Sequence, residues 1–269
     1  YPVCDVAKGE CLKSSEDFFG IPYMTKRQPL KHADIIEAVN ADTESTWKAG
    51  VNENFRGWSD EDLSEIMGTV LGRDPRLESS THVEGQAPAS FESSAKWPGC
   101  IGPVMNQARC GSCWAFGAAE SISDRMCIEG KVSSFLQLAP LDLVTCDNGF
   151  FNNGCQGGMP SAAWQWVQST GIVTESCSPY LVSEGGPIPT CPPSQQPCLN
   201  FVSTPACHET CKNSSLNYES DKHHISNVYS VSGEQQMMAE LAKNGPFEVA
   251  MTVYADFVHY KSGVYQHKT

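Results

Sequence analysis

The sequence predicts an α+β protein, because helical patterns occupy its first two thirds and a strand-like alternation follows near its end. Apolar residues at helical spacing begin near residue 32, and a second, nearly uninterrupted helical run begins at or just before Cys113. Residues 247–257 alternate apolar and polar side chains, as a half-buried strand does. Helices early in the chain and strands late are typical of an α+β architecture.

The first part of the chain divides into an extension, residues 1–31, and a short helical unit. Four apolar residues of this unit recur at roughly helical spacing: Ile35, Ile36, Val39 and Trp47. A second helix is predicted after Ser59, whose pairing with Asp62 resembles a capping box. Residues 73–86 are polar and contain proline and glycine, so we expect an exposed linker that ends a unit over 32–86.

The larger unit, residues 87–269, carries three further helix signals. The run from Cys113 places five side chains along one face: Trp114, Ala118, Ser121, Ile122 and Met126. Pro160 and Gly171 frame the second helix, because proline is favoured in the first turn and glycine just beyond the last. Residues 233–246 predict the third helix, which a Gly-Pro pair stops.

Composition and charge exclude several classes of function. The formal charge of -13 and the pI near 4.9 argue against nucleic-acid binding, which needs a basic surface. Hydrophobic residues make up 40% of the chain, so we expect a packed core rather than disorder. No apolar run is long enough to span a membrane.

Thirteen cysteines in 269 residues predict a disulfide-rich protein of the secretory pathway. They recur in short-spaced groups, several of them in the loop-rich region 177–222. The odd total leaves at least one cysteine unpaired if all the others form bridges. A glycosylation sequon at Asn213 fits the same compartment.

The pair Cys110 and Cys113, separated by two residues, admits three interpretations. A helix that opens at Cys113 favours a reversible dithiol couple, although no βαβ pattern surrounds it. A zinc site would need further ligands, which three residues could supply: Cys207, Cys211 and His208. In the third interpretation Cys113 is a nucleophile, and the Gln107 side chain, six residues earlier, donates to the oxyanion.

The third interpretation agrees with a family resemblance. Residues 106–116 and the Cys-Gln-Gly-Gly at 155–158 are similar to the two signatures of papain-like cysteine peptidases. Further segments resemble the cathepsin B-like branch of that family: 46–52, 67–72, 87–100, 121–128, 237–257 and 260–267. The resemblance covers about residues 32–269.

The resemblance implies a papain-like fold of two domains, one helical and one similar to a β-barrel, preceded by a small helical pro-segment. It implies that the protein hydrolyses peptide bonds with the Cys113 thiolate as nucleophile. Gln107 is expected to help bind the oxyanion that forms on the attacked carbonyl. Gly157 and Gly158 are expected to hold the substrate backbone, and Gly111 to line the first pocket.

The family pattern also implies most of a disulfide set that leaves Cys113 as the free thiol. The pairs are Cys4–Cys11 in the extension, then Cys100–Cys127, Cys110–Cys155, Cys146–Cys207, Cys177–Cys211 and Cys191–Cys198. A further small bridge, which that branch has just after the position of Cys146, is absent here because both of its cysteines are replaced within residues 147–153.

The resemblance places the family's catalytic histidine and its orienting asparagine beyond Thr269, so that this chain lacks part of the second domain. We therefore expect His259 and His267 to be structural, and the chain to be part of a longer zymogen. A papain-like protein that only binds, and a thiol oxidoreductase that uses Cys110 and Cys113, are the alternatives.

Substrate cleavage is expected to be of the endopeptidase type. The segment between Cys191 and Cys198 lacks the two adjacent histidines with which the cathepsin B-like branch captures a terminal carboxylate. Little or no carboxydipeptidase activity is therefore expected. The adjacent pair His223 and His224 matches a later segment and is expected to be solvated.

The implied partners are protein and peptide substrates, cystatin-like inhibitors and the chain's own pro-segment. Residues 32–86 are expected to lie along the cleft in the reverse direction and to block it. Low pH would loosen them by protonating carboxylates that are paired in the closed form. No cofactor, metal, nucleic acid or membrane span is expected, and the location is a lysosome, an equivalent acidic vesicle or the cell exterior.

Overall fold

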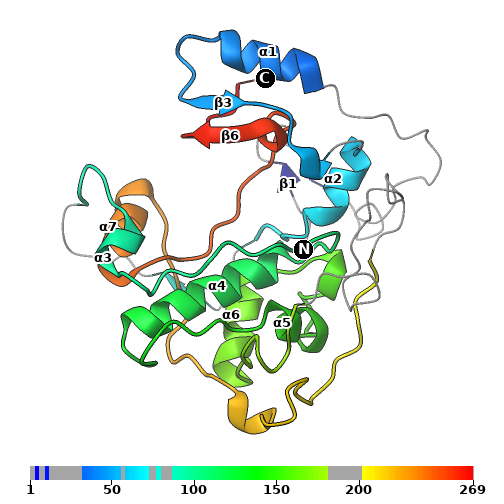
Figure 1. Ribbon diagram of the computed structural model, residues 1–269, viewed down its shortest axis with the longest axis vertical. Coiled ribbons are helices and arrows are strands. Elements are labelled where there is room, and N and C mark those ends of the chain that lie inside the picture. Colours follow the sequence, from blue (N-terminus) through cyan, green and yellow to red (C-terminus); the bar gives the residue numbers. More distant parts are fainter. Residues whose placement is uncertain are drawn as a thin grey trace.

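The computed structural model describes residues 4–5, 10–11, 32–55, 58–72, 77–79, 87–180 and 202–268. These residues form an α+β fold, as expected (Figure 1). Figure 1 shows a helical part in its lower half and, at the opposite end, a helix beside a two-stranded sheet. Among the described residues, no helix has the length and apolar character that crossing a bilayer requires.

The helical part is built around α4 (Cys113–Ile128), which packs against α5 (Pro140–Cys146) and α6 (Pro160–Ser169). The predicted face of α4 is buried at four positions: Trp114, Ala118, Ser121 and Ile122. Its fifth member, Met126, is half-buried and packs against the same core. Fully burying a large apolar side chain stabilises by about 1.5–3 kcal/mol, so this face holds α4 in place.

The third predicted helix is α7 (Glu234–Asn244), which ends at Gly245. The φ of Gly245 is 97°, a conformation that favours glycine and stops the helix where the sequence indicated. The single turn α3 (Ser93–Lys96) lies beside it, and Lys96 donates a hydrogen bond to the carbonyl of Ala242. Four 3-10 turns complete the helical elements that are described: η1 (Glu53–Phe55), η2 (Gly154–Gln156), η4 (Glu219–Asp221) and η5 (Phe257–His259).

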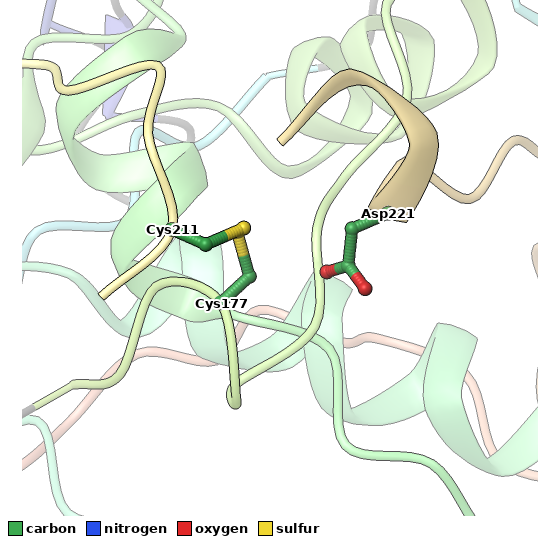
Figure 2. Close-up of side chains that lie close together, drawn as sticks. All are labelled: Cys177, Cys211 and Asp221. Atoms are coloured by element: carbon green, nitrogen blue, oxygen red, sulfur yellow. A yellow bond between two sulfur atoms is a disulfide. The ribbon is translucent and has the colours of Figure 1, made fainter. Parts of the chain in front are cut away.

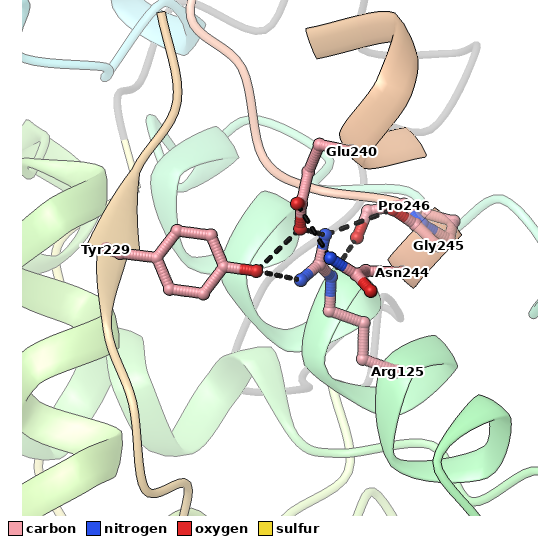
Figure 3. Close-up of polar contacts among 6 residues, drawn as sticks. All are labelled: Arg125, Tyr229, Glu240, Asn244, Gly245 and Pro246. Atoms are coloured by element: carbon pink, nitrogen blue, oxygen red, sulfur yellow. Dashed lines mark hydrogen bonds and ion pairs between the residues drawn. The ribbon is translucent and has the colours of Figure 1, made fainter. Parts of the chain in front are cut away.

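A buried polar network joins α7 to α4 (Figure 3). Arg125 Nη2 lies 2.8 Å from Glu240 Oε1, and the Tyr229 hydroxyl donates to the same oxygen at 2.6 Å. Asn244 donates to the other Glu240 oxygen, and Arg125 also donates to the Pro246 carbonyl. Burial raises the pKa of Glu240, but these three donors outweigh burial and leave the pKa below its ordinary value.

Residues 32–79, which we call the leading segment, begin with α1 (His32–Ala41). The chain then turns, and Trp47 lies on β3 (Trp47–Ala49), so the prediction that placed Trp47 on a helical face is wrong. The polar residues between them favour a turn: Asp42 accepts a hydrogen bond from the Glu44 backbone, and its carbonyl accepts one from Ser45.

The second predicted helix of the leading segment is α2 (Asp60–Ile66). Its capping box is confirmed, because the Ser59 hydroxyl accepts from the Asp62 N–H while the Asp62 carboxylate accepts from the Ser59 N–H. The Asp62 side chain is also turned toward the helical part, where it meets Arg109.

The sheet at the top of Figure 1 joins distant parts of the chain, because β3 pairs antiparallel with β6 (Tyr260–Gly263). The other described strands are short: β1 (Cys4–Asp5) pairs antiparallel with β2 (Glu10–Cys11), and β4 (Glu78–Ser79) pairs parallel with β5 (Tyr229–Ser230). The expected Cys4–Cys11 and Cys191–Cys198 bridges concern side chains outside the described residues.

The predicted strand at 247–257 is absent, and the strand in this region is β6 instead. Val249 is 59% exposed and Met251 is 49% exposed, so the apolar face that the alternation predicts is not buried at these positions. No described strand pairs with it. Alternation predicts a strand only where a neighbour supplies the hydrogen bonds and a buried face. In contrast, the prediction of a loop-rich region 177–222 holds for its described residues.

Replacing Glu240 with alanine should destabilise the fold by about 3 kcal/mol or more, because Arg125 would be left without its buried partner. The midpoint of urea unfolding measures the loss. Glu219→Ala is the matched control, since this carboxylate is 73% exposed and 3.5 Å from Lys222. Its expected cost is below about 1 kcal/mol, and equal costs in the two variants would contradict the prediction.

Candidate active site

Cys113 begins α4 and is the free cysteine among the described residues. Its side chain is half-buried, and its Sγ lies 3.0 Å from the hydroxyl of Thr69. A helix N-terminus presents backbone N–H groups without helical partners and the positive end of the helix dipole. Negative charge on sulfur is stabilised there, which is what a thiolate nucleophile requires.

Cys110 is not available as a redox partner, because it forms a disulfide with Cys155. Both residues are fully buried. Beside the disulfide, the Gly111 N–H donates to the Cys155 carbonyl at 2.9 Å. The dithiol interpretation is therefore wrong, and the two signature segments are held together by one covalent bond and one hydrogen bond.

Three more of the expected disulfides are present: Cys100–Cys127, Cys146–Cys207 and Cys177–Cys211. Figure 2 shows the Cys177–Cys211 sulfurs near Asp221, a grouping that superficially resembles a metal site. Zinc binds thiolates, whereas these sulfurs are bonded to each other. The Asp221 carboxylate accepts two hydrogen bonds from Thr174 at 2.8 Å. The zinc interpretation of Cys207 and Cys211 is therefore wrong.

Gln107 lies in the loop before α4, and its amide meets the leading segment three residues before Thr69, the residue at the Cys113 sulfur. Its Nε2 donates to the Cys110 carbonyl and to the Ile66 carbonyl of the leading segment, both at 2.8 Å. The amide thus already binds a carbonyl oxygen of a chain that crosses the site. This is the property expected of a donor to an oxyanion.

Three glycines make the surface over which that chain passes. A Cβ on Gly111 would lie 2.6 Å from the Cys155 carbonyl oxygen, and one on Gly157 would lie 2.6 Å from the Gly68 carbonyl oxygen. A Cβ on Gly158 would meet the Trp114 ring at 2.5 Å. A side chain at Gly111 or Gly157 would therefore prevent the close approach of two backbones, and one at Gly158 would collide with the buried Trp114 ring beneath.

The leading segment crosses the site by backbone pairing. The Gly158 N–H donates to the Gly68 carbonyl, and the Val70 N–H donates to the Gly158 carbonyl, both at 2.8 Å. Thr69 and Gly158 form a bridge of parallel sense. As a result Thr69 places its side-chain hydroxyl, rather than a backbone carbonyl, at the Cys113 sulfur.

Two anchors hold the part of the leading segment that precedes this crossing. At the first, Arg109 lies 3.0 Å from Asp62 and stacks over the Trp58 ring at 4.3 Å, with both charged groups buried. At the second, the Trp47 indole N–H donates to the Gln266 carbonyl at 2.8 Å, and Lys268 lies 3.0 Å from Asp42.

Two histidines, His259 and His267, flank β6, the strand that pairs with β3 of the leading segment. His259 is fully buried, and its carbonyl accepts from the Gly50 N–H at 2.8 Å. His267 lies 3.1 Å from Asp256 and stacks on Tyr254 at 3.7 Å. Of the pair expected to be solvated, His224 is exposed and His223 is half-buried.

Sequence reasoning missed a buried support beneath Gly158. Asn152 donates to Asp147 and accepts from the Met159 N–H at 2.8 Å, and both side chains belong to residues only 4% exposed. Burial raises the pKa of Asp147 to about 6, although hydrogen bonds from Asn152 and the Gly149 N–H act to lower it. An acid directly after Cys146 was the available signal, but nothing in its spacing shows that it would be buried.

Comparison with known proteins identifies the family. The papain family cysteine proteases match residues 87–269. The chain belongs to this family. It is 45% identical over 226 residues to cathepsin B of Dictyostelium discoideum, a match that covers 79% of this chain and 70% of that protein.

Two further relatives agree on the cathepsin B-like branch. Cathepsin B-like cysteine proteinase 5 of Caenorhabditis elegans is 35% identical over 268 residues, which is 92% of this chain and 76% of that protein. The structure of proCathepsin B S9 from Trypanosoma congolense matches with a TM-score of 0.76 at 30% identity, covering 90% of this chain and 79% of that one. The fold is papain-like, and the protein is a cathepsin B-like cysteine-type peptidase.

Gly68→Ala should displace the leading segment, because the new Cβ would lie 1.7 Å from the Gly111 carbonyl oxygen. Losing the two hydrogen bonds to Gly158 should expose Cys113 and raise its alkylation rate by iodoacetamide about tenfold or more. Peptide mass spectrometry of the full chain measures this rate.

The matched control for this experiment is Gly72→Ala in the same segment. Its Cβ would meet only the flexible end of the Met159 side chain, at 3.2 Å. Its alkylation rate should equal that of the wild type. The same rate in Gly68→Ala would show that the backbone contact does not seat the segment.

Proposed function

We propose that this chain is the zymogen of a cathepsin B-like cysteine endopeptidase. The observation that carries the proposal is the 3.0 Å contact between the Cys113 sulfur and Thr69, within a segment that pairs with both polar backbone groups of Gly158. A segment that covers the nucleophile and uses the backbone groups a substrate would need acts as an intramolecular inhibitor.

In this proposal the Cys113 thiolate attacks the carbonyl carbon of a peptide bond, and the carbonyl electron pair moves to oxygen. The Cys113 N–H and the Gln107 amide bind the resulting oxyanion. Gln107 gains this freedom when the Ile66 carbonyl leaves. Gly157 and Gly158 pair with the substrate backbone, and Gly111 lines the first pocket.

The general base is not assigned to a described histidine. The His259 carbonyl and the His267 ring have the contacts given above. From the family resemblance, we expect the base to be an imidazole from a later part of the protein. This base accepts the thiol proton and returns it to the leaving amine. The division into an extension (1–31), a pro-segment (32–86) and a peptidase domain (87–269) belongs to the same proposal.

The route through the secretory pathway is supported by the disulfides and by the sequon. Four disulfides lie among the described residues, a number that suits an oxidising compartment. Asn213 is exposed in a tight turn, where its Oδ1 accepts from the Ser215 N–H and hydroxyl. We propose a lysosome, an equivalent acidic vesicle or secretion, with peptides, proteins and cystatin-like inhibitors as partners.

Endopeptidase action rests on the sequence between Cys191 and Cys198, which lies outside the described residues. This interval contains no histidine, so it offers no imidazole pair to bind a terminal carboxylate. Cleavage within a chain is then expected to exceed the removal of dipeptides from a free C-terminus.

Catalysis is tested on the protein from its native source after removal of the leading segment, with variants expressed in the same host. Cys113→Ala should abolish hydrolysis of an internally quenched peptide. Gln107→Ala should lower kcat about 10²–10³-fold, the usual effect of losing one oxyanion donor. Product analysis with peptides that have blocked or free C-termini reports the mode of cleavage.

Gln168→Ala is the matched control, since this exposed glutamine lies on α6 and donates to the Ser226 carbonyl. It should retain wild-type kcat. Hydrolysis that survives in Cys113→Ala would refute the mechanism. A processed wild type that binds peptides without hydrolysing them would favour the alternative of a papain-like binding protein.

Acidification should open the second anchor. Hydrogen bonds from Lys268 and the Glu44 N–H lower the pKa of Asp42 below its ordinary 3.8. Because the folded-state pKa is the lower one, the stability that this carboxylate contributes is present above that ordinary value and is lost as pH falls through the folded value. The opening rate of β3 should therefore rise as pH falls below about 4.

Hydrogen exchange at residues 47–49, corrected for the intrinsic effect of pH, measures this opening. Asp42→Asn should open faster than the wild type at pH 6, and the two rates should converge at low pH. Asp34→Asn, an exposed acid on α1, is the control and should follow the wild type. A wild-type rate that is flat from pH 7 to pH 3 would contradict the prediction.

A further inference from the structure

One buried hydroxyl contacts both parts of the loop that carries the catalytic groups. The Tyr180 hydroxyl donates to the Gln107 carbonyl at 2.9 Å and lies 3.0 Å from the Ser112 hydroxyl. Gln107 supplies the oxyanion donor of the proposed mechanism, and Ser112 immediately precedes Cys113. Tyr180 itself touches neither the sulfur nor the Gln107 amide.

The loop between Gln107 and Ser112 needs such a support. Ala108 has a φ of 53°, the one described non-glycine residue in the left-handed region, where a side chain is strained. Asn106 relieves part of this by accepting from the Ala108 N–H at 2.8 Å. A strained backbone persists only where the surrounding contacts hold it, and the carbonyl of Gln107, next to Ala108, is held by Tyr180.

Ser112 gives a second, independent indication. It is the N-cap residue of α4, a position where serine usually accepts a hydrogen bond from the first turn of its helix. Here its side chain makes no such bond, and its fully buried hydroxyl meets Tyr180 at 3.0 Å and, less closely, the Cys110 carbonyl at 3.4 Å. The Ser112 hydroxyl therefore links the start of α4 to Tyr180 and does not cap the helix.

Tyr180 is itself held rigidly. It is 7% exposed, and its ring meets the Phe116 ring edge-on at 4.6 Å. Its N–H donates to Glu175 at 2.6 Å, and the nearby Cys177 is tied to Cys211. Burial raises the pKa of Tyr180 well above its ordinary value, so the hydroxyl remains a donor over the whole working range of pH.

We propose that Tyr180 is a positioning residue, whose hydroxyl fixes Gln107 and Ser112 so that the oxyanion donor and the Cys113 sulfur keep a productive separation. The inference rests on the proposed function. Displacing a catalytic group by about 1 Å commonly costs about 10²-fold in rate, so a contact that does not touch the reacting atoms is enough to matter.

Tyr180→Phe tests the proposal in the processed enzyme, because it removes one oxygen and keeps the ring against Phe116. We expect kcat to fall between about tenfold and hundredfold while KM changes less than about twofold, since the loss falls on the transition state. Ser112→Ala should lower kcat in the same way. The double variant should lose less than the product of the two single losses, because both remove the same contact.

Tyr218→Phe is the matched control, because Tyr218 is a second buried tyrosine, and its hydroxyl donates to Asp142 at 2.6 Å. It should lower the melting temperature without lowering kcat. Wild-type kcat in Tyr180→Phe would overturn the proposal. The proposal would also be overturned if kcat fell in both tyrosine variants in proportion to their loss of stability.

A second readout separates this inference from the proposed function. The alkylation rate of Cys113 between pH 5 and pH 9 reports the placement of the sulfur even if the wild type hydrolyses no peptide. In Tyr180→Phe the profile should shift, while in Tyr218→Phe it should match the wild type. An unchanged profile in Tyr180→Phe would overturn the positioning role, whatever the peptidase assay shows.

Discussion

The Cys110–Cys155 disulfide is the constraint on which the proposed site depends. It spans 45 residues of sequence, and in the chain-entropy account a bridge of that span stabilises the fold by about 4 kcal/mol. Its larger effect is geometric. The Gly111 N–H meets the Cys155 carbonyl beside it, so the start of α4 and the Gly157–Gly158 surface cannot separate. The Cys113 sulfur, the proposed oxyanion donor Gln107 and the backbone groups of Gly158 thereby all meet the leading segment.

The leading segment is recognised through its backbone where it crosses the site, and through its side chains in the part that precedes the crossing. Between Gly68 and Val70 the contacts join backbone N–H groups to backbone carbonyls. Almost any segment with a glycine at position 68 could make these contacts. Specificity for this particular segment comes from the two anchors, Asp62 with Arg109 and Trp47 with β6. A chain without those anchors would offer the cleft the same backbone but would be held less tightly.

Local signals were enough to predict much of the fold from the sequence. The capping box at Ser59, the start of α4 at Cys113 and the stop at Gly245 depend on neighbours in sequence, and each was found where expected. The segment 247–257 failed because a strand depends on a partner. Trp47 failed because a short polar turn outweighed helical spacing.

The candidate site divides in the same way. Cys113, Gln107 and the glycines were found through the two signature motifs, and their roles are still proposals. Asp147 was not found because the sequence does not show that this acid is buried with Asn152. Tyr180 was not found because its hydroxyl contacts a residue that is distant in sequence. No spacing rule shows that a tyrosine hydroxyl will reach a carbonyl 73 residues earlier in the chain.

The docking of Trp47 has a consequence for the surface of the processed protein. Trp47 packs against Tyr260 and Tyr265, and Phe257 lies 4.8 Å from Tyr265, so the leading segment covers a cluster of aromatic rings. Its departure would leave these rings facing water. Exposed apolar patches promote self-association and adhesion to other surfaces. If the protein is processed as we propose, the zymogen and the processed form would thus differ in colloidal behaviour as well as in access to the thiol, and the covering segment would keep the zymogen soluble.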